Sequence, residues 1–379
     1  MIYLDSAATT LQKPPAVARA MAKAVGELSS PGRGGHRPAV AAGETVYRCR
    51  ELAAGLFQME DPSRVVFTAS ATHGLNIAIK SLVKPGDQVV ISGYEHNAVT
   101  RPLHALDCKI RVAAGPLFDK ESNLTAFGRE ITEEVSCVIC THVSNVFGFR
   151  LPVEEIADLC RERGVPLILD ASQSAGVLPI RMEDWGLAYA AMPGHKGLYG
   201  PQGTGMLLVG RGQTPNPLIE GGTGSNSALQ EMPEFLPDRL ESGTHNVTGI
   251  AGLLEGLRFV EAQGEGTIGL RENRLRDRLV RGLSRLPGVR VFQDREGENQ
   301  TGVVSFVLEG QDCQEVGEIL GQRGIALRSG LHCAPLAHET AGTLKTGTIR
   351  ASFSAFNTPA EADRLTEEIR RLSRMGNFQ

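Results

Sequence analysis

Between Arg64 and Gly210, short apolar runs alternate with segments of helical pattern, and few folds accommodate that alternation. The apolar runs are RVVFTAS, DQVVIS, SCVICTHVS and VPLILDAS, and the segments between them include THGLNIAIKSL, HNAVTRPLHAL and PVEEIADLCRERG. Strands that alternate with helices of this length form βαβ units around a mostly parallel sheet. The pattern therefore predicts an α/β fold.

Polar residues follow four of the predicted strands at the point where each strand ends. They are Thr72, His96, Asn145 and Asp170. In open parallel sheets, ligands bind beyond the carboxyl ends of the strands. We therefore expect these side chains to surround one binding site.

The chain of 379 residues is longer than one hydrophobic core usually supports, so we expect about two domains. After Gly249 the pattern changes to helices and short strands, with a last helix from Pro359, which is typical of a smaller α+β domain. We assign residues 16–249 to the large domain, and residues 1–15 together with 250–379 to the small domain.

Charge and hydropathy exclude several partners. Lys and Arg total 39 against 43 Asp and Glu, and the net charge of −4 provides no general attraction to nucleic acid or to anionic membranes. The chain has no run of 18 apolar residues, and its start, MIYLDSAATTL, does not resemble a secretion signal. We therefore expect a cytoplasmic protein that acts on a small molecule.

The seven cysteines are an odd number in a chain without a secretion signal, which favours reduced thiols over disulfides. Cys137 and Cys140 would face opposite sides of one strand, and we find no ligand set at zinc spacing, so we predict no metal site. Cys333 differs from the others because it follows a histidine in the loop RSGLHCAPLAH. It should be exposed there and able to ionise near histidine or arginine.

One pair of residues indicates the chemistry. The apolar run that ends in Asp170 would bring a carboxylate to a protonated pyridine nitrogen. Lys196, among glycines in MPGHKGLYGPQGTG, suits a Schiff base with an aldehyde. Together they suggest an enzyme that uses pyridoxal 5'-phosphate, although each residue taken singly is more often just solvated.

Further groups support that interpretation. FTASATHGLN runs from a strand into a helix, so backbone N–H groups and the Thr72 hydroxyl would face an anion, although Thr72 is equally an ordinary helix cap. His96 could lie flat over a ring, with Asn145 and Gln173 donating to the ring hydroxyl. Arg350 could hold a carboxylate through two hydrogen bonds. A dinucleotide site is poorly supported, because GPQGTG lacks the flanking strand and helix.

The chain resembles the cysteine desulfurases of the fold type I, class V aminotransferase superfamily, and more narrowly the branch that includes selenocysteine lyases. The resemblance extends over nearly the whole chain, in the ordered motifs YLDSAATT, GRGGH, EHNAV, HVSN, DASQSAG, GHKGLYGPQGTG, EGGTGS, LESGTHN, RSGLHCAP and IRASFSAFNT. It implies a large domain with a mostly parallel sheet of the seven-stranded type, and a small domain that contains the catalytic cysteine loop.

The resemblance also implies roles for individual residues. Lys196 would form the Schiff base, with Asp170 on the ring nitrogen and His96 on the ring face. Cys333 would be the nucleophile that takes the sulfur. Further cofactor contacts are implied for Gln173, Asn145, Ala71, Thr72, His195 and, from the second subunit of a homodimer, Thr244. Substrate contacts are implied for Arg350, Asn145, His36 and Arg328.

The sequence departs from the family pattern near the expected phosphate site. Pro193 stands where relatives commonly have a hydroxyl residue, and proline offers neither a hydroxyl nor an N–H. His73 stands where an acidic residue is frequent, and Ala71 where some relatives have a second threonine. Cofactor binding is therefore expected to be weaker, or to be supported by other residues.

The resemblance predicts conversion of L-cysteine to L-alanine with a persulfide on Cys333, and transfer of the sulfur to an acceptor protein or thiol. A selenocysteine lyase acting on L-selenocysteine, another C–S lyase or a class V aminotransferase are the alternatives within this chemistry. Cys333 favours desulfuration, because transamination needs no thiol nucleophile. A cofactor-binding carrier or scaffold without turnover is the remaining alternative, and it would not need both Lys196 and Cys333.

Overall fold

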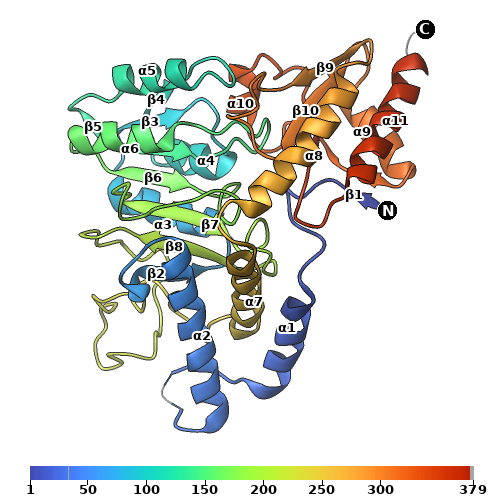
Figure 1. The fold of residues 1–379 in the computed structure, drawn as a ribbon. Coiled ribbons are helices and arrows are strands. Elements are labelled where there is room, and N and C mark those ends of the chain that lie inside the picture. The colour runs from blue at the N-terminus through green and yellow to red at the C-terminus, as the bar shows by residue number, and fades with distance from the viewer. Residues whose placement is uncertain (33, 376–379) are drawn as a thin grey trace.

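The structure is a computed structural model that describes residues 1–32 and 34–375. A seven-stranded sheet is its largest element. Its strands are β2 (Val65–Thr68), β3 (Gln88–Ser92), β4 (Lys109–Ala113), β5 (Val135–Thr141), β6 (Leu167–Asp170), β7 (Tyr189–Pro193) and β8 (Gly205–Val209). They lie in the order β2-β8-β7-β6-β5-β3-β4, and neighbours are parallel except that β8 is antiparallel to both β7 and β2. The prediction of an α/β fold with a mostly parallel sheet is confirmed (Figure 1).

Helices pack on both faces of this sheet. They are α2 (Arg37–Leu56), α3 (Ala71–Leu82), α4 (Asn97–Ala105), α5 (Lys120–Glu130), α6 (Val153–Glu162) and α7 (Val247–Gln263), with a 3-10 helix at Pro62–Arg64. A further helix, α1 (Pro15–Glu27), packs on α7. Successive residues of a strand point to opposite faces. In β5, Cys137 and Ile139 join the core under α3 and α4, whereas Val138 and Cys140 join the core under α2, α5, α6 and α7. Cys137 and Cys140 therefore face opposite sides, as predicted.

The C-terminal part of the chain forms a smaller antiparallel sheet with its own apolar core. Its elements are α8 (Thr267–Leu283), β9 (Val289–Phe292), β10 (Val303–Leu308), α9 (Cys313–Gln322), β11 (Ile325–Ala326), β12 (Arg328–Gly330), α10 (Pro335–Thr340), β13 (Thr348–Ser352) and α11 (Pro359–Met375). Four of the strands pair in the order β12-β13-β10-β9. The domain boundaries after residues 15 and 249 stay a prediction.

The N-terminus joins this C-terminal part. β1 (Ile2–Tyr3) pairs in parallel with β11, and Asp5 forms a bridge with Ser352 at the end of β13. From there the chain runs to α1, which packs against α7 (Figure 1). Residues 5–13 therefore connect the small sheet to the rest of the fold.

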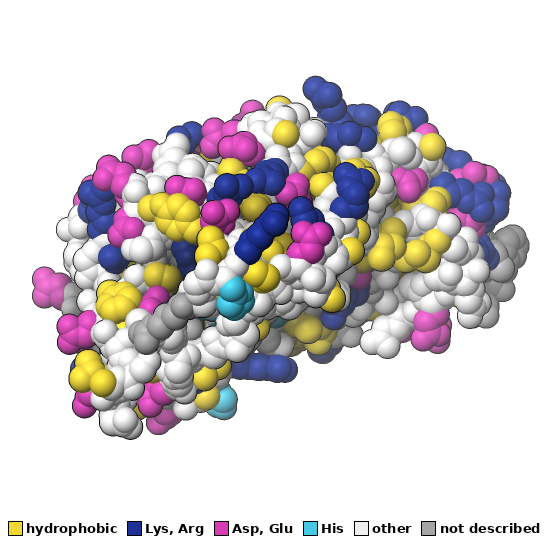
Figure 2. Space-filling view, turned by 90° about the horizontal axis from the view of Figure 1, so that it is seen from below, with side chains coloured by type: hydrophobic (Ala, Val, Ile, Leu, Met, Phe, Trp, Pro, Cys, Tyr) yellow, Lys and Arg dark blue, Asp and Glu magenta, His cyan; other side chains and the backbone are white. Residues whose placement is uncertain are grey.

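The surface is of mixed charge. On the face seen in Figure 2, lysine and arginine side chains lie among aspartate and glutamate side chains. Within residues 1–32 and 34–375, no helix is both long enough and apolar enough to cross a membrane.

Gly176 allows the segment after Asp170 to lie close to the loop after β7. Its φ is +81°, and a Cβ at this position would collide with the backbone carbonyl of Gly197. We expect Gly176→Ala to destabilise the protein by about 3 kcal/mol or more, because backbone strain and a steric clash occur together.

Gly164→Ala is the matched control for this prediction. Gly164 also has a positive φ, +67°, but a Cβ there meets no atom within 4 Å. Its replacement should therefore cost only the left-handed strain, about 1–2 kcal/mol. Urea unfolding curves measure both losses, and equal losses would contradict the packing argument.

Candidate active site

Lys196 lies half-buried in the loop that follows β7. Burial lowers the pKa of Lys196 to about 8, with Asp170 opposing this change and the guanidinium of Arg350 adding to it. Arg328 also contributes to the lowering. These three charged residues, predicted from separate parts of the sequence, are thus brought together around one lysine. An amine of lowered pKa is neutral more often near pH 7, and only the neutral amine is a nucleophile.

Asp170 is the last residue of β6 and is 2% exposed. Its Oδ1 accepts the backbone N–H of Ser172 at 2.9 Å. The parallel neighbours β5 and β7 hold this strand in the middle of the sheet. The buried strand therefore delivers a fixed carboxylate to the sheet edge where Lys196 lies.

His96 caps the N-terminus of α4. Its Nδ1 accepts the backbone N–H of Ala98 at 3.0 Å, which places the proton of the neutral ring on Nε2. Burial lowers the pKa of His96, and Lys196 lowers it further, whereas Asp170 opposes the change. A neutral imidazole held by its edge leaves its flat face available for stacking on another ring.

The N-terminus of α3 begins directly after β2, at the same edge of the sheet. Ser70 caps it, because its Oγ accepts the backbone N–H of His73 at 3.2 Å. The alternative in which Thr72 is the cap is therefore wrong. Ala71 is buried in the first turn and Thr72 is exposed. A helix start of this kind attracts anions through its N–H groups and its dipole.

His195 is held by the N-terminal segment. Its Nδ1 lies 3.0 Å from the hydroxyl of Thr9, and its carbonyl accepts from the backbone N–H of Thr10 at 3.1 Å and from Nζ of Lys13 at 2.9 Å. Burial lowers the pKa of His195 to about 4, and the charges of Lys196 and Lys13 add to this. His195 is therefore neutral near pH 7.

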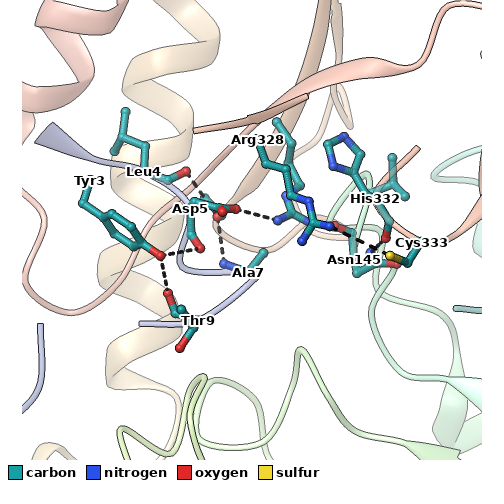
Figure 3. Close-up of polar contacts among 12 residues, drawn as sticks. Tyr3, Leu4, Asp5, Ala7, Thr9, Asn145, Arg328, His332 and Cys333 are labelled. Carbon is teal, nitrogen blue, oxygen red and sulfur yellow. Dashed lines mark hydrogen bonds and ion pairs between the residues drawn. The ribbon is translucent and has the colours of Figure 1, made fainter. Parts of the chain in front are cut away.

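Cys333 lies exposed in the loop after β12. Both His332 and Cys333 have left-handed backbones, with φ of 50° and 57°, and two contacts hold this turn. The backbone N–H of Asn97, next to His96, donates to the Cys333 carbonyl at 2.8 Å. Asn145 Nδ2 donates to the His332 carbonyl at 2.8 Å (Figure 3). A guanidinium nitrogen of Arg328 lies 3.9 Å from the Cys333 sulfur. The thiol is thus fixed beside the residues that surround Lys196.

The guanidinium of Arg350 is 1% exposed and only partly engaged. One terminal nitrogen donates to the Asn145 carbonyl at 2.8 Å, and the other donates to Oδ1 of Asp5 at 2.7 Å. Its Nε is buried and has no hydrogen-bond partner among the described residues. A buried donor without a partner is costly in free energy. A ligand with a carboxylate could accept a hydrogen bond from this Nε.

Gln173 and Asn145 are partly engaged with the protein. Gln173 Nε2 donates to the Ala7 carbonyl at 2.9 Å, and Asn145 Nδ2 donates to the loop of Cys333. Each amide has a second N–H. The predicted hydrogen bonds to a ring hydroxyl would have to use that second N–H.

The N-terminal segment YLDSAATT also contributes to this site, although the sequence by itself predicted no role for it. Figure 3 shows Asp5 and Thr9 on one side and Cys333 with Asn145 on the other. Asp5 pairs with Arg350, and Thr9 meets His195. The sequence feature that could have indicated a role is the polar run DSAATT, which is followed shortly by Lys13. A local pattern does not show which distant residues this run contacts.

Two predicted residues lie outside this cluster in the single chain. His36, exposed, caps the start of α2, which Figure 1 shows at the lower end of the molecule, and Arg33 of the same motif lies outside the described residues. Thr244 lines a hollow of about 220 Å³ beside the start of α3, together with Ala69 and His73.

The cysteines are unpaired, and the structure describes all seven. Five are buried, Cys108 is half-buried and Cys333 is exposed. No group of three or more His, Cys, Asp or Glu side chains in the described part of the chain could hold a metal ion.

The fold and the residues at the carboxyl edge of the large sheet define a class of protein. It is an α/β enzyme with a lysine of lowered pKa, a carboxylate at a strand end and an exposed cysteine beside them. The chain belongs to the aminotransferase class-V family, whose model matches residues 2–365. Members of this family in general depend on pyridoxal 5'-phosphate.

Relatives of this chain include proteins named as cysteine desulfurases. It is 32% identical to probable cysteine desulfurase 2 of Mycobacterium leprae, covering 98% of this chain and 91% of the relative. It is also 32% identical to a cysteine desulfurase of Escherichia coli O157:H7, covering 99% of this chain and 94% of the relative. A probable cysteine desulfurase of Mycolicibacterium paratuberculosis is longer, and this chain spans 56% of it at 30% identity over 99% of this chain.

Solved structures agree. The apo cysteine desulfurase of Thermococcus onnurineus superimposes with a TM-score of 0.90 at 29% identity, over 98% of this chain and 94% of that one. The cysteine desulfurase CsdA of Escherichia coli gives a TM-score of 0.86 at 26% identity, over 98% and 94%. The similarity to the cysteine desulfurase family inferred from the motifs is therefore confirmed.

Proposed function

We propose that this protein is a pyridoxal 5'-phosphate-dependent cysteine desulfurase that converts L-cysteine to L-alanine and leaves a persulfide on Cys333. One observation supports this more than any other. The backbone carbonyl of Cys333 accepts the N–H of Asn97, at the start of the helix capped by His96, so the loop that carries the exposed thiol borders the site of Lys196 and Asp170. A transaminase would not need a nucleophilic sulfur at this place.

The residues present fit the cofactor. Asp170 supplies a carboxylate for the ring nitrogen, and His96 supplies a flat neutral ring. Ala71, Thr72 and His195 would hold the phosphate. The N–H groups at the start of α3 would offset part of its negative charge. Pro193, the last residue of β7, offers no donor there. The bound cofactor would supply an aldehyde for amino groups and an electron sink for the substrate.

The chain's own residues would then perform the reaction. Lys196, of lowered pKa, accepts the α-proton of the substrate, while Asp170 holds a proton on the ring nitrogen. Arg350 orients the substrate carboxylate, and the guanidinium of Arg328 lies beside the Cys333 sulfur. The thiolate forms a bond to the substrate sulfur as the C–S bond breaks. The electrons of that bond stay on Cβ, which takes up a proton, and Lys196 returns a proton to Cα to give alanine.

The proposal includes a second copy of this chain. Thr244 of that copy would contact the phosphate, and an acceptor protein or thiol would collect the sulfur from Cys333. The long segment 214–246 exposes apolar side chains, including Leu229 and Phe235, which a second copy could cover. Mass measurement of the native protein in solution would test the homodimer.

The direct test is a product assay with L-cysteine and a reductant. Alanine and sulfide should form in equal amounts, and only in the presence of the cofactor. Formation of pyruvate in place of alanine would indicate a different C–S lyase. Parallel assays with L-selenocysteine would show which of the two amino acids has the higher kcat/KM.

Arg350→Lys is expected to raise KM for L-cysteine by about 10- to 100-fold, because one hydrogen bond between charged groups contributes about 1.5–3 kcal/mol. Lysine keeps the charge but not the planar fork that a carboxylate needs. Steady-state kinetics measure the change. The control is Arg285→Lys, at an exposed arginine. An unchanged KM for the Arg350 variant would contradict the assigned substrate contact.

A further inference from the structure

Glu95 is a buried carboxyl that the proposed reaction does not use. It lies between β3 and α4, directly before His96, and is 0% exposed. In the sequence it belongs to the motif EHNAV. The charge of Asp170, at the end of the next strand but one in the sheet, acts on Glu95.

The contacts of Glu95 connect two strand ends. Its Oε1 accepts from the hydroxyl of Ser92, the last residue of β3, and from the backbone N–H of Thr141, the last residue of β5, at 2.7 Å. Thr141 is in turn the register partner of Asp170 on β6. Glu95 therefore fixes the turn before His96 relative to the strand that flanks Asp170.

The other oxygen of Glu95 shows which protonation state fits. Oε2 is buried and has no hydrogen-bond partner among the described residues. The titratable groups that face Glu95 are Asp170 on β6 and the buried thiol of Cys140 on β5, and neither is a cation. An ionised carboxylate without a cation would be strongly disfavoured in such a place.

Burial raises the pKa of Glu95 to about 8, and the charge of Asp170 adds to this, against the hydrogen bonds from Ser92 and Thr141. Glu95 is therefore mostly protonated near pH 7. A second negative charge beside that of Asp170 would be repelled, whereas a neutral acid adds no repulsion there.

We propose that Glu95 is a positioning residue: as a neutral carboxylic acid it joins the ends of β3 and β5, holds His96 in place, and adds no second negative charge beside Asp170, the residue that would face the ring nitrogen. The part that concerns the cofactor rests on the proposed function. The protonation state does not, because it follows from the surroundings of Glu95 in the chain itself.

The first experiment measures unfolding of the cofactor-free full chain as a function of pH, for wild type and Glu95→Gln. Glutamine keeps the acceptor and cannot titrate. The pKa of Glu95 is raised on folding from 4.5 to about 8, so its proton favours the folded state. That stability is complete below pH 4.5 and is lost as the pH rises toward 8.

Between these limits, the unfolding equilibrium constant of wild type, divided by that of Glu95→Gln, should rise about tenfold per pH unit. The control is Glu121→Gln, at an exposed glutamate, and its unfolding equilibrium constant should show no such trend relative to wild type. Parallel curves for wild type and Glu95→Gln between pH 5 and 8 would overturn the proposal.

The second experiment measures the affinity for pyridoxal 5'-phosphate by absorbance titration at pH 7. Glu95→Gln should bind within about threefold of wild type, and Glu95→Ala at least about tenfold more weakly, since one lost hydrogen bond to a buried group costs about 1–3 kcal/mol. Equal affinity of wild type and Glu95→Ala would overturn the positioning role.

Glu272→Ala is the matched control. Glu272 lies on α8, is 6% exposed, and burial also raises its pKa to about 8. The Glu272→Ala variant should lose stability without a loss of cofactor affinity, and this result would separate general destabilisation from positioning.

If wild type itself bound no cofactor, the proposed function would fail, while the pH experiment would still decide the protonation state of Glu95. If Glu95→Ala did not fold, Glu95→Asp would replace it, with the same expected loss of affinity because the shorter side chain cannot reach Thr141.

Discussion

Replacing Cys333 by alanine is expected to reduce formation of alanine and sulfide from L-cysteine by at least about 1,000-fold, the scale on which loss of a nucleophile acts in other enzymes. Cys333 is the exposed thiol among the seven cysteines, and its loop is tied to α4 beside His96. Cofactor binding should be unchanged, since the thiol touches none of the groups assigned to the ring or the phosphate.

The matched control is Cys108→Ala. Cys108 is the half-buried cysteine, and burial raises the pKa of its thiol, as do the nearby carboxylates of Asp87 and Asp107. This variant should keep full activity. Labelling of the persulfide after one turnover, followed by peptide mass analysis, would locate the sulfur on Cys333 in wild type. Undiminished turnover by Cys333→Ala under reducing conditions would disprove the desulfurase mechanism.

Replacing Lys196 by alanine is expected to abolish the visible absorbance of the cofactor-loaded protein and to lower turnover by at least about 1,000-fold. The amine is both the attachment point and the proposed base. Lys345→Ala, at an exposed lysine, is the control and should change neither property.

The lowered pKa of Lys196 adds a pH test. With a pKa of about 8, half of the amine is neutral at pH 8, against about 0.3% for a lysine of ordinary pKa. The rate at which the cofactor-free chain captures pyridoxal 5'-phosphate should therefore rise with pH and level off above about pH 8. A rate that still rises tenfold per unit beyond pH 9 would contradict the burial of this lysine.

The sheet and the strand-end residues were predictable because both depend on local patterns. Runs such as VPLILD are apolar throughout since β6 is covered on both faces, and Asp170 ends the run where the strand leaves the core. The carboxyl ends of parallel strands meet at one edge of the sheet. The sequence alone therefore predicted that His96, Asn145 and Asp170 lie close together.

Other assignments needed the tertiary structure. Ser70 rather than Thr72 caps α3, because the helix begins at Ala71, two residues earlier than a Thr72 cap would allow. Gln173 and Asn145 donate to backbone carbonyls that no periodicity identifies as neighbours. The contributions of His36 and Thr244 stay predictions, since a single chain does not test contacts between subunits.

The sequence by itself determined the α/β fold, the order of the motifs and the placement of Asp170 and Lys196 at one edge of the sheet, because these depend on spacing along neighbouring strands and turns. Only the tertiary structure decided how Asp5 meets Arg350 and how Glu95 joins two strand ends. Asp5 and Arg350 are 345 positions apart, and they meet because β1 pairs with β11 beside β13. The physical reason is that contacts between residues far apart in the sequence form only when strands and helices pack together and exclude water, and a local pattern of residues does not specify that packing.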